Sequence, residues 1–395
     1  MPVREIRPEE RADFERLESI AFASPLSEED LRRRLEQEAD AVCLGHFGDA
    51  GTLTAGMVLP EYQMRYEGRY VTMVGVGGVA SLPEYRYQGA IRRVFEAAFA
   101  RMRAGGAVFS ALYPFSHPYY RQFGYELCQL TARYTLPVDD ALRGFRCEAT
   151  VRRIEPGDPI DGLQAVYDAH FARCNMAIRR EARHWQGLMT KEPLRERVYT
   201  YLLQDAQGPC AYVIFAAQNV GEYSKEMRVR EIAFTHPKGL RDALGFLYRL
   251  SAQYGKVVLT LPDGVPLHAV LPESYDANAD IFSHPMARVV DLPRALALKP
   301  HPAGAAYTLR VHDAMIPGND GLFAVHCEGA DVSVRRLEAD APADLEAGVQ
   351  QITQLLLGFL SLDEALYSPD VALRAHGDTL RQIFVKRPVY LTEFF

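Results

Sequence analysis

The clearest hydrophobic pattern lies between residues 71 and 125, where it changes from strand to helix and back to strand. Residues 71–82, VTMVGVGGVASL, form an apolar run spaced by glycines, which is typical of a buried strand. A helix is then predicted from one apolar face at i, i+3, i+4, i+7, i+8 and i+11 spacing, formed by Ile91, Val94, Phe95, Ala98, Phe99 and Met102. Gly105 and Gly106 end this helix, and the strand AVFSALY follows. The pattern predicts a βαβ crossover.

The loop that precedes this helix carries the first candidate chemistry. Gly89 stands where the helix begins, and it has no side chain to block an approaching group. The helix dipole favours an anion there, and the first turn leaves backbone amides without helical partners, at Gln88, Gly89, Ala90 and Ile91. Positive charge is added by Arg86, Arg92 and Arg93. The loop therefore indicates a diphosphate site, although an ordinary helix start in a doubly wound sheet would read the same way.

The remaining segments of the first part predict a mixed α/β domain that ends near residue 145. We expect a strand at 3–6, a helix at about 8–21 and a charged helix capped by Ser27. Strands follow at 41–47 and 52–57, and a strand at 128–136 is expected to close the domain.

A weak internal echo predicts a second domain over residues 146–285. Strands at 198–203, 211–216 and 230–234, a leucine-rich helix and the strand VVLTL at 257 repeat the order of the first domain. Here the loop reads T-H-P-K-G-L, so Gly239 is present, the arginine is absent and Pro237 removes an amide donor. We interpret this domain as a degenerate copy without a bound cofactor.

Residues 286–395 have a different rhythm and predict a third, α+β domain. Antiparallel strands are expected at 307–311, 322–327 and 332–337. They are followed by a helix through Leu345, Val349, Ile352, Leu356 and Phe359. Asp313, Asn319 and Asp320 could suggest a cation loop, but turn chemistry explains Asn-Asp-Gly, and we expect no metal.

Composition narrows the functional classes. The 395 residues carry a net charge of −7, which argues against broad nucleic-acid binding. No apolar run approaches the length of a membrane span, and the charged start is unlike a secretory signal. Six widely spaced cysteines without a C-x-x-C pair argue against a disulfide framework or zinc site. These features predict a cytoplasmic protein.

Three segments together resemble the Eis-like branch of the GNAT N-acetyltransferases over essentially the whole chain. R-Y-Q-G-A-I is similar to the family's acetyl-CoA pyrophosphate loop, Q/R-x-x-G-x-G/A, with Arg86 and Gly89 matching. Ile91 stands where a small residue is usual, a departure that the Eis-like branch shares. F-S-H-P-Y-Y-R-Q-F-G-Y-E and the final Y-L-T-E-F-F also resemble that branch. The resemblance implies two tandem GNAT domains, a sterol-carrier-protein-like third domain that is structural, and a hexamer.

The resemblance also implies site residues. Acetyl-CoA would be held by the backbone of Val79, Ala80 and Ser81, by the segment Tyr87, Gln88, Gly89, Ala90, Ile91 and Arg92 together with Arg86, and by Phe115 and Ser116. Tyr120 would be the general acid, and the carboxylate of the final residue, Phe395, the general base. Phe22 is a candidate wall of the acceptor cleft, and Glu393 competes for the role of base. Gly78 stands where a mycobacterial form has a bulkier aromatic residue.

The predicted function is acetyl transfer from acetyl-CoA to a primary amine by direct attack on the thioester. Aminoglycosides, polyamines, small amines and lysine side chains all remain possible acceptors. One alternative is a non-catalytic carrier of apolar ligands that uses the third domain, with the GNAT halves as scaffold. Another is aminoacyl or longer acyl transfer on the same fold.

Overall fold

The computed structural model describes residues 3–395 except 38–40, 50, 222–223, 263, 276, 330 and 339–340. The chain forms two compact units. The first unit combines the residues up to Gln129 with His284–Phe395, and the second unit comprises Leu130–Ser283. Both are mixed α/β structures, as the sequence predicts. Among the described residues, no helix has both the length and the apolar character needed to cross a membrane.

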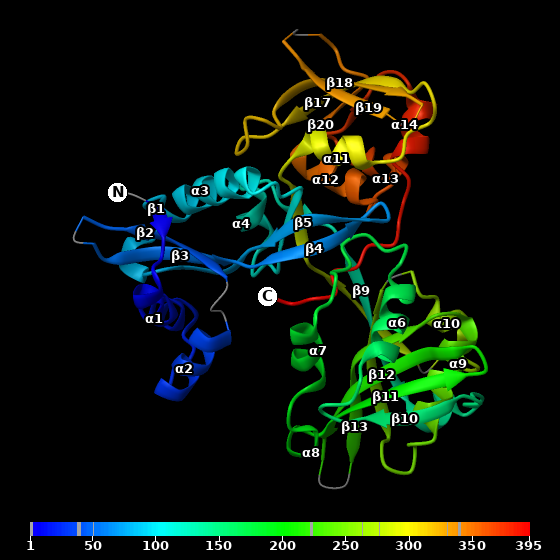
Figure 1. The fold of residues 1–395 in the computed structure, drawn as a ribbon. Helices are drawn as coiled ribbons and strands as arrows, with labels where there is room; N and C mark the ends of the chain where they lie inside the picture. The colour runs from blue at the N-terminus through cyan, green and yellow to red at the C-terminus, as the bar shows by residue number, and fades with distance from the viewer. Residues whose placement is uncertain are drawn as a thin grey trace. The chain divides into compact units, whose positions relative to one another are not determined.

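The amino-terminal part of the first unit contains two sheets that are joined by one extended segment. In one sheet the order is β1 (Val3–Glu5), β2 (Val42–Phe47), β3 (Leu53–Leu59) and β6 (Gly77–Ser81). In the other it is β4 (Glu61–Tyr66), β5 (Arg69–Gly75), β7 (Phe109–Leu112), β16 (Met286–Val289) and β8 (Glu126–Leu127). Only Val76 separates β5 from β6, so one extended segment passes from the second sheet into the first (Figure 1).

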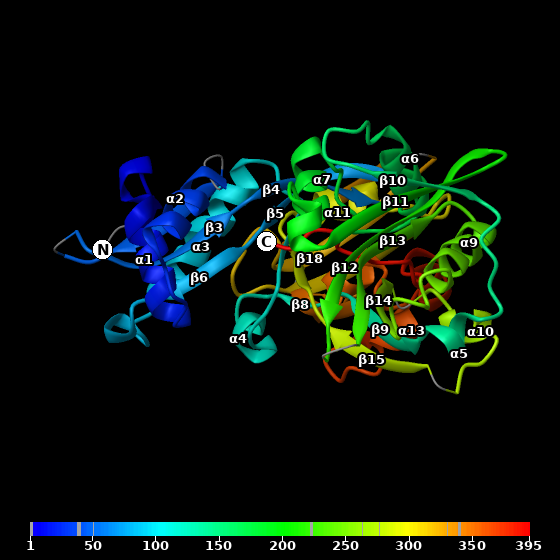
Figure 2. The same ribbon diagram turned by 90° about the horizontal axis from the view of Figure 1, so that it is seen from below.

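Two helices cover opposite faces of the four-stranded sheet. Phe14 and Leu17 of α1 (Arg11–Phe22) pack with Val58 and Ala80, whereas α3 (Ala90–Ala104) packs against the alternate strand residues. Because successive strand residues face opposite sides, the two helices lie on opposite faces: α3 lies above the sheet and α1 below it in Figure 1, and α1 lies in front of it when seen from below in Figure 2. The predicted apolar face of α3 is confirmed by five fully buried residues, Val94, Phe95, Ala98, Phe99 and Met102. The helix α2 (Glu28–Gln37) follows α1, with the predicted cap in place: the Asp30 amide donates to Ser27 Oγ at 3.1 Å.

The carboxy-terminal part of the first unit has a five-stranded sheet in the order β19 (Asp331–Leu337), β18 (Gly321–Glu328), β17 (Ala306–His312), β20 (Leu345–Gly348) and β21 (Ala372–Leu373). The helix predicted from Leu345 begins only at Val349, as α12 (Val349–Leu357). The preceding residues form β20 instead, because Leu345 and Ala347 are buried alternately and pair parallel with β17. Short helices complete this part: α11 (Leu292–Leu298), α13 (Leu362–Ala365) and α14 (Gly377–Ile383).

A buried ion pair ties β16 to the carboxy-terminal part. Arg288 is fully buried, and its guanidinium donates to Asp313 Oδ2 at 2.5 Å. The other carboxylate oxygen accepts from the amides of Met315 and Ile316, both at 3.0 Å. The Asn319 side-chain amide adds a further donor to Asp313 at 3.2 Å. In the turn that contains Asp313, Asn319 and Asp320, the Asp313 carboxylate therefore binds the guanidinium of Arg288 and the backbone amides of the turn.

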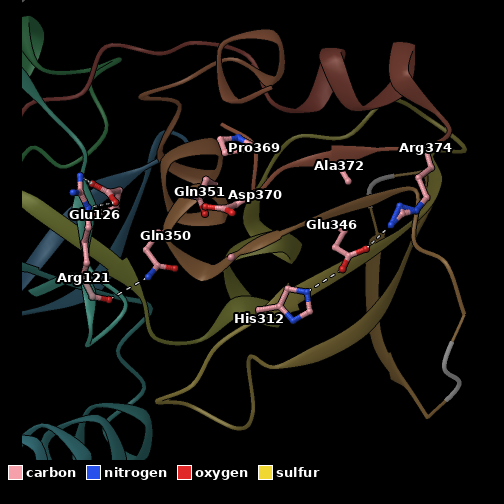
Figure 3. Close-up of a pocket in the computed structure, with 11 residues that line it drawn as sticks. Arg121, Glu126, His312, Glu346, Gln350, Gln351, Pro369, Asp370, Ala372 and Arg374 are labelled. Atoms are coloured by element: carbon pink, nitrogen blue, oxygen red, sulfur yellow. Dashed lines mark hydrogen bonds and ion pairs between the residues drawn. The ribbon is translucent and has the colours of Figure 1, made fainter. Parts of the chain in front are cut away.

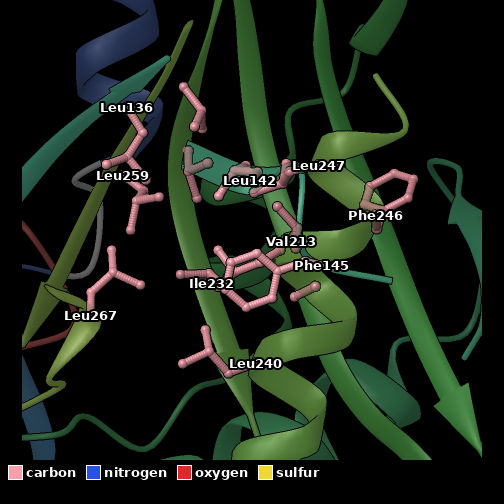
Figure 4. Close-up of a cluster of buried hydrophobic side chains, with 14 of the residues drawn as sticks. Leu136, Leu142, Phe145, Val213, Ile232, Leu240, Phe246, Leu247, Leu259 and Leu267 are labelled. Carbon is pink, nitrogen blue, oxygen red and sulfur yellow. The ribbon is translucent and has the colours of Figure 1, made fainter. Parts of the chain in front are cut away.

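The second unit is a seven-stranded sheet in the order β10 (Thr150–Ile154), β11 (Val198–Asp205), β12 (Gly208–Asn219), β13 (Lys225–Phe234), β14 (Lys256–Pro262), β9 (Leu130–Pro137) and β15 (Asn278–Ser283). Its core is an apolar cluster between this sheet and α9 (Pro237–Tyr248), including Leu136, Val213 and Leu247 (Figure 4). Contrary to our expectation, the strand near 128–136 does not close the first domain: β9 pairs with β14 and β15. In turn β16 enters the first unit, between β7 and β8.

Candidate active site

The first unit opens where two parallel strands part. Gly75 of β5 pairs with Ala111 of β7, and the Val76 amide still donates to the Ala111 carbonyl at 2.9 Å. Beyond Val76, β6 pairs only with β3 among the described strands, which leaves its other edge open. The predicted cofactor residues Val79, Ala80 and Ser81 lie on this open edge. Open backbone donors and acceptors on a strand edge can hold an extended amide-bearing ligand.

The start of α3 forms an accessible anion site. Its N-cap is Gly89, at φ 75°, and no side chain caps this terminus. A Cβ added at Gly89 would have no atom within 4 Å, so no protein group crowds this residue at the helix start. Backbone amides at such a terminus bind phosphate groups. The residues present therefore fit the diphosphate of a coenzyme A thioester.

The side chains of this loop are placed at its rim. Tyr87 is fully exposed at φ 63°, and the Arg86 guanidinium donates to the Ala21 carbonyl at 3.5 Å. Gln88 donates from its side chain to the Glu84 carbonyl at 3.2 Å. Arg92 pairs with Glu96 at 3.3 Å on the exposed side of α3. The two arginines thus supply positive charge at the surface around the helix start.

The corresponding loop of the second unit is closed. His236 caps α9, and its Nδ1 accepts from the Gly239 amide at 3.1 Å. A Cβ added at Gly239 would lie 2.5 Å from the Cys210 carbonyl oxygen, whereas a Cβ added at Gly89 would have no atom within 4 Å. Pro237 has no amide hydrogen to offer. The helix start in the second unit is therefore already occupied by protein groups.

Tyr120 lies in the short helix α4 (His117–Arg121), which follows β7. Its ring is buried at 4% exposure, edge-on to Phe95 and Phe115. Its hydroxyl makes no hydrogen bond to any described residue, which leaves it available to a bound group. Burial raises the pKa of Tyr120 well above its ordinary value, with a smaller contribution from Tyr119. The phenol is therefore a proton carrier that stays neutral near pH 7.

The predicted cap of α4 is present and brings two further site residues together. Ser116 is the N-cap, and its Oγ accepts from the Tyr119 amide at 3.4 Å. Phe115 is 70% exposed, and its ring lies 5.0 Å from that of Tyr119. Phe115 and Ser116 thus stand at the surface between the end of β7 and Tyr120.

The carboxy-terminal residues lie against the strand where β5 becomes β6. A Cβ added at Gly75 would be 2.6 Å from the Phe395 ring, and one at Gly77 would be 3.5 Å from the Phe395 carboxyl carbon. The ring lies 5.2 Å from that of Tyr62 and 5.8 Å from that of Tyr113. The α-carboxyl group of Phe395 thus lies beside the strand that carries the predicted cofactor residues.

The two remaining candidates are Glu393, which lies next to the carboxy-terminal residues, and Phe22, at the end of α1. Glu393 is half-buried, and its backbone carbonyl accepts from the Tyr113 hydroxyl at 2.9 Å. Phe22 is the last residue of α1 and is 52% exposed. Tyr113 and Tyr62, which the sequence reasoning missed, position the carboxy-terminal segment. Their only signal in the sequence was that Tyr113 follows a buried strand next to the Phe115–Tyr120 segment.

A separate cavity of about 800 Å³ lies between α4, β8 and the carboxy-terminal sheet (Figure 3). Its charged groups are largely paired with one another: Arg121 with Glu126 at 2.8 Å, and Glu346 with Arg374 at 2.9 Å and His312 at 3.0 Å. Its lining is polar, unlike that of a pocket for an apolar ligand. We therefore place the candidate chemistry at the parted strands.

Comparison with known protein families agrees with this arrangement. Residues 2–128 match the model of an acetyltransferase (GNAT) domain, residues 176–289 match a second acetyltransferase (GNAT) domain, and residues 292–392 match a sterol carrier protein domain. A search of curated proteins found no match.

Several solved structures share the whole fold. One is a conserved protein from Enterococcus faecalis, described as a probable N-acyltransferase, at TM-score 0.87 and 23% identity, covering 100% of this chain and 99% of that chain. A GCN5-related N-acetyltransferase from Anabaena variabilis has TM-score 0.85 and 19% identity, covering 100% of both chains. Eis1 from Mycobacterium abscessus has TM-score 0.81 and 18% identity, again covering 100% of both chains.

Proposed function

We propose that the chain is an Eis-like GNAT N-acetyltransferase, because it matches two GNAT domains and a sterol carrier protein domain in that order, and that its amino-terminal GNAT domain acetylates primary amines at the parted strands. The observation that carries this proposal is that β6, with its open edge, leads into the uncapped start of α3, while the carboxyl group of Phe395 lies beside β6. Acetyl-CoA, when bound, supplies a thioester as acyl donor.

Different residues would bind the cofactor and accept the proton in this reaction. The amides at the start of α3, with Arg86 and Arg92 nearby, would hold the diphosphate, and the edge at Val79, Ala80 and Ser81 would hold the extended amide arm. The Phe395 carboxylate would take a proton from the attacking amine. The ring of Phe395 packs among those of Tyr62 and Tyr113, which positions the last residue beside the strand.

Tyr120 would assist the leaving thiol. A thiol has a pKa near 8.5, so its anion is a tolerable leaving group that gains from a hydrogen-bond donor. Tyr120 is protonated near pH 7, so its hydroxyl can donate a hydrogen bond to the sulfur and deliver a proton as the C–S bond breaks. Positioned acid and base groups contribute about 10²- to 10⁴-fold, and orientation supplies much of the rest.

We assign the activity to the first GNAT domain alone. The contrast between the open Gly89 and the closed Gly239 supports this assignment, because only the former leaves helix amides accessible. A hexameric, cytoplasmic assembly belongs to the same proposal, on the strength of the family resemblance. Light scattering on the purified protein tests the oligomeric state.

The decisive experiment measures thiol release from acetyl-CoA against a panel of amines, including aminoglycosides, diamines and lysine peptides. Release with any amine, abolished in Gly89→Asp because a carboxylate would repel the diphosphate, supports the proposal. Tight acetyl-CoA binding without release on the panel would leave the domain a binder without this reaction. Absence of both binding and release would overturn the proposal.

A further inference from the structure

The strand beside Phe395 contains a bulge that turns two consecutive glycines to one face. In the pairing of β3 with β6, Gly56 pairs with Ala80 and Val58 with Gly77, so β6 carries one extra residue. Gly78 lies in this bulge at φ 56°. A Cβ at either Gly77 or Gly78 would point to a carboxyl group, because β-bulges interrupt the alternation of strand faces.

The carboxyl groups beside these two glycines come from opposite ends of the chain. A Cβ added at Gly77 would be 3.5 Å from the carboxyl carbon of Phe395. One added at Gly78 would be 2.0 Å from Glu18 Oε1 on α1. Since neighbouring Cα atoms are about 3.8 Å apart, the two carboxyl groups flank adjacent points on one strand. Glu18 is half-buried on α1.

Only glycine at position 78 allows this arrangement. The Glu18 carboxylate occupies the space that any side chain at that position would fill, and the positive φ of Gly78 disfavours other residues. A larger residue there would push the carboxylate away from the strand. Gly78 and Glu18 therefore act as a matched pair that adds a negative charge next to the Phe395 carboxyl group.

We propose that Glu18 binds a second ammonium group of the acceptor, so that the enzyme prefers aliphatic diamines and polyamines to monoamines. This inference rests on the proposed function. The reacting nitrogen bonds to the acetyl carbon as the C–S bond breaks, its proton passes to the Phe395 carboxylate, and the thiolate takes a proton from Tyr120. The second ammonium meanwhile stays protonated and donates charge-assisted hydrogen bonds to Glu18.

The first test compares 1,4-diaminobutane with 1-aminobutane, which differ by one ammonium group. Glu18→Gln should lower kcat/KM for the diamine about tenfold, mainly through KM, and change that for the monoamine less than twofold. The matched control is Asp13→Asn, which removes an exposed carboxylate from the same helix and should leave both substrates unchanged. An equal loss for both amines in Glu18→Gln would make Glu18 a structural residue and overturn the proposal, as would no loss.

A second test separates binding from turnover. N,N,N′,N′-tetramethyl-1,4-diaminobutane carries two cations and accepts no acetyl group, so calorimetry reports its binding even if no amine is acetylated. Glu18→Gln should weaken this binding about tenfold, and unchanged binding would refute the role of Glu18. If the wild type binds the ligand through Glu18 but releases no thiol with any amine, the proposed reaction fails while the cation site stands.

The coupling between the two positions gives a third readout. Gly78→Ala should reproduce the selective loss of diamine activity, because its methyl group displaces the carboxylate. In a Glu18→Ala background the same substitution should no longer change the ratio of diamine to monoamine activity. Additive effects of the two substitutions on that ratio would overturn the matched-pair inference.

Discussion

Moving the carboxyl group of Phe395 is the sharpest perturbation of the proposed mechanism. Adding Gly-Ser-Ser after Phe395 replaces the α-carboxylate by a neutral amide and can carry the new terminus about 10 Å away. Loss of a positioned base should lower kcat/KM about 10²- to 10⁴-fold for every amine. The dissociation constant of acetyl-CoA should change less than twofold, because the start of α3 at Gly89 is untouched.

The assay combines thiol release, calorimetric titration with acetyl-CoA and intact mass, which confirms the last residue of each protein. A control with the same tripeptide at the amino terminus should be fully active. Phe395→Ala keeps the carboxylate but removes the ring that lies against Gly75, Tyr62 and Tyr113. Its two aromatic contacts are worth about 1–3 kcal/mol together, so an intermediate loss is expected. An extended protein with kcat/KM within threefold of the wild type would refute the terminal-carboxylate mechanism.

Four further predictions test other parts of the first unit. Gly89→Ala should raise the acetyl-CoA dissociation constant about fivefold or more in calorimetry with little change in kcat, because a Cβ at φ 75° is strained and narrows the approach to the amides. Tyr120→Phe should lower kcat about 10²-fold while acetyl-CoA affinity stays within twofold. Asp313→Ala should cost about 3–5 kcal/mol in denaturant unfolding, because it leaves the Arg288 guanidinium buried without its carboxylate. Burial, and secondarily the charge of Arg93, lower the pKa of His46 in the folded protein. The contribution of His46 to the free energy of unfolding is therefore complete above about pH 6.5 and is lost as the pH falls toward its folded pKa. His46→Gln should flatten the dependence of the free energy of unfolding on pH below about pH 6.5, and an unchanged slope would contradict this.

The sequence predicts those elements whose signal is local. The apolar spacing of α3, the glycine at its start and the Ser116 cap all follow from neighbouring residues, so their positions agree with the structure. The sequence predicts helix where the structure has β20, because Leu345 and Val349 are spaced four apart, which fits one helical face as well as one face of a strand. Its pairing with β17 decides the outcome, and that pairing is invisible in the segment itself.

The sequence also does not show which strands pair with one another. A hydrophobic pattern shows that residues 130–137 form a strand, but it does not show which sheet the strand joins. The same holds for Met286–Val289, which enters the sheet of the first unit although it follows the second unit in sequence. The contacts of Glu18 with Gly78 and of Phe395 with Gly77 are likewise tertiary, so no spacing rule could have found them.

The candidate site depends on both parts of the first unit. The Arg288–Asp313 ion pair anchors β16 to the carboxy-terminal part, and α12 packs against β16, with Thr353 Oγ1 accepting from the Val289 amide at 2.9 Å. From that part the chain returns to Phe395, beside a strand more than three hundred residues earlier in the sequence. The position of the proposed base is thus set by the folding of the carboxy-terminal part. A substitution that loosens the Arg288 pair should therefore reduce amine acetylation more than acetyl-CoA binding, since α3 and its open start lie in the other part of the unit.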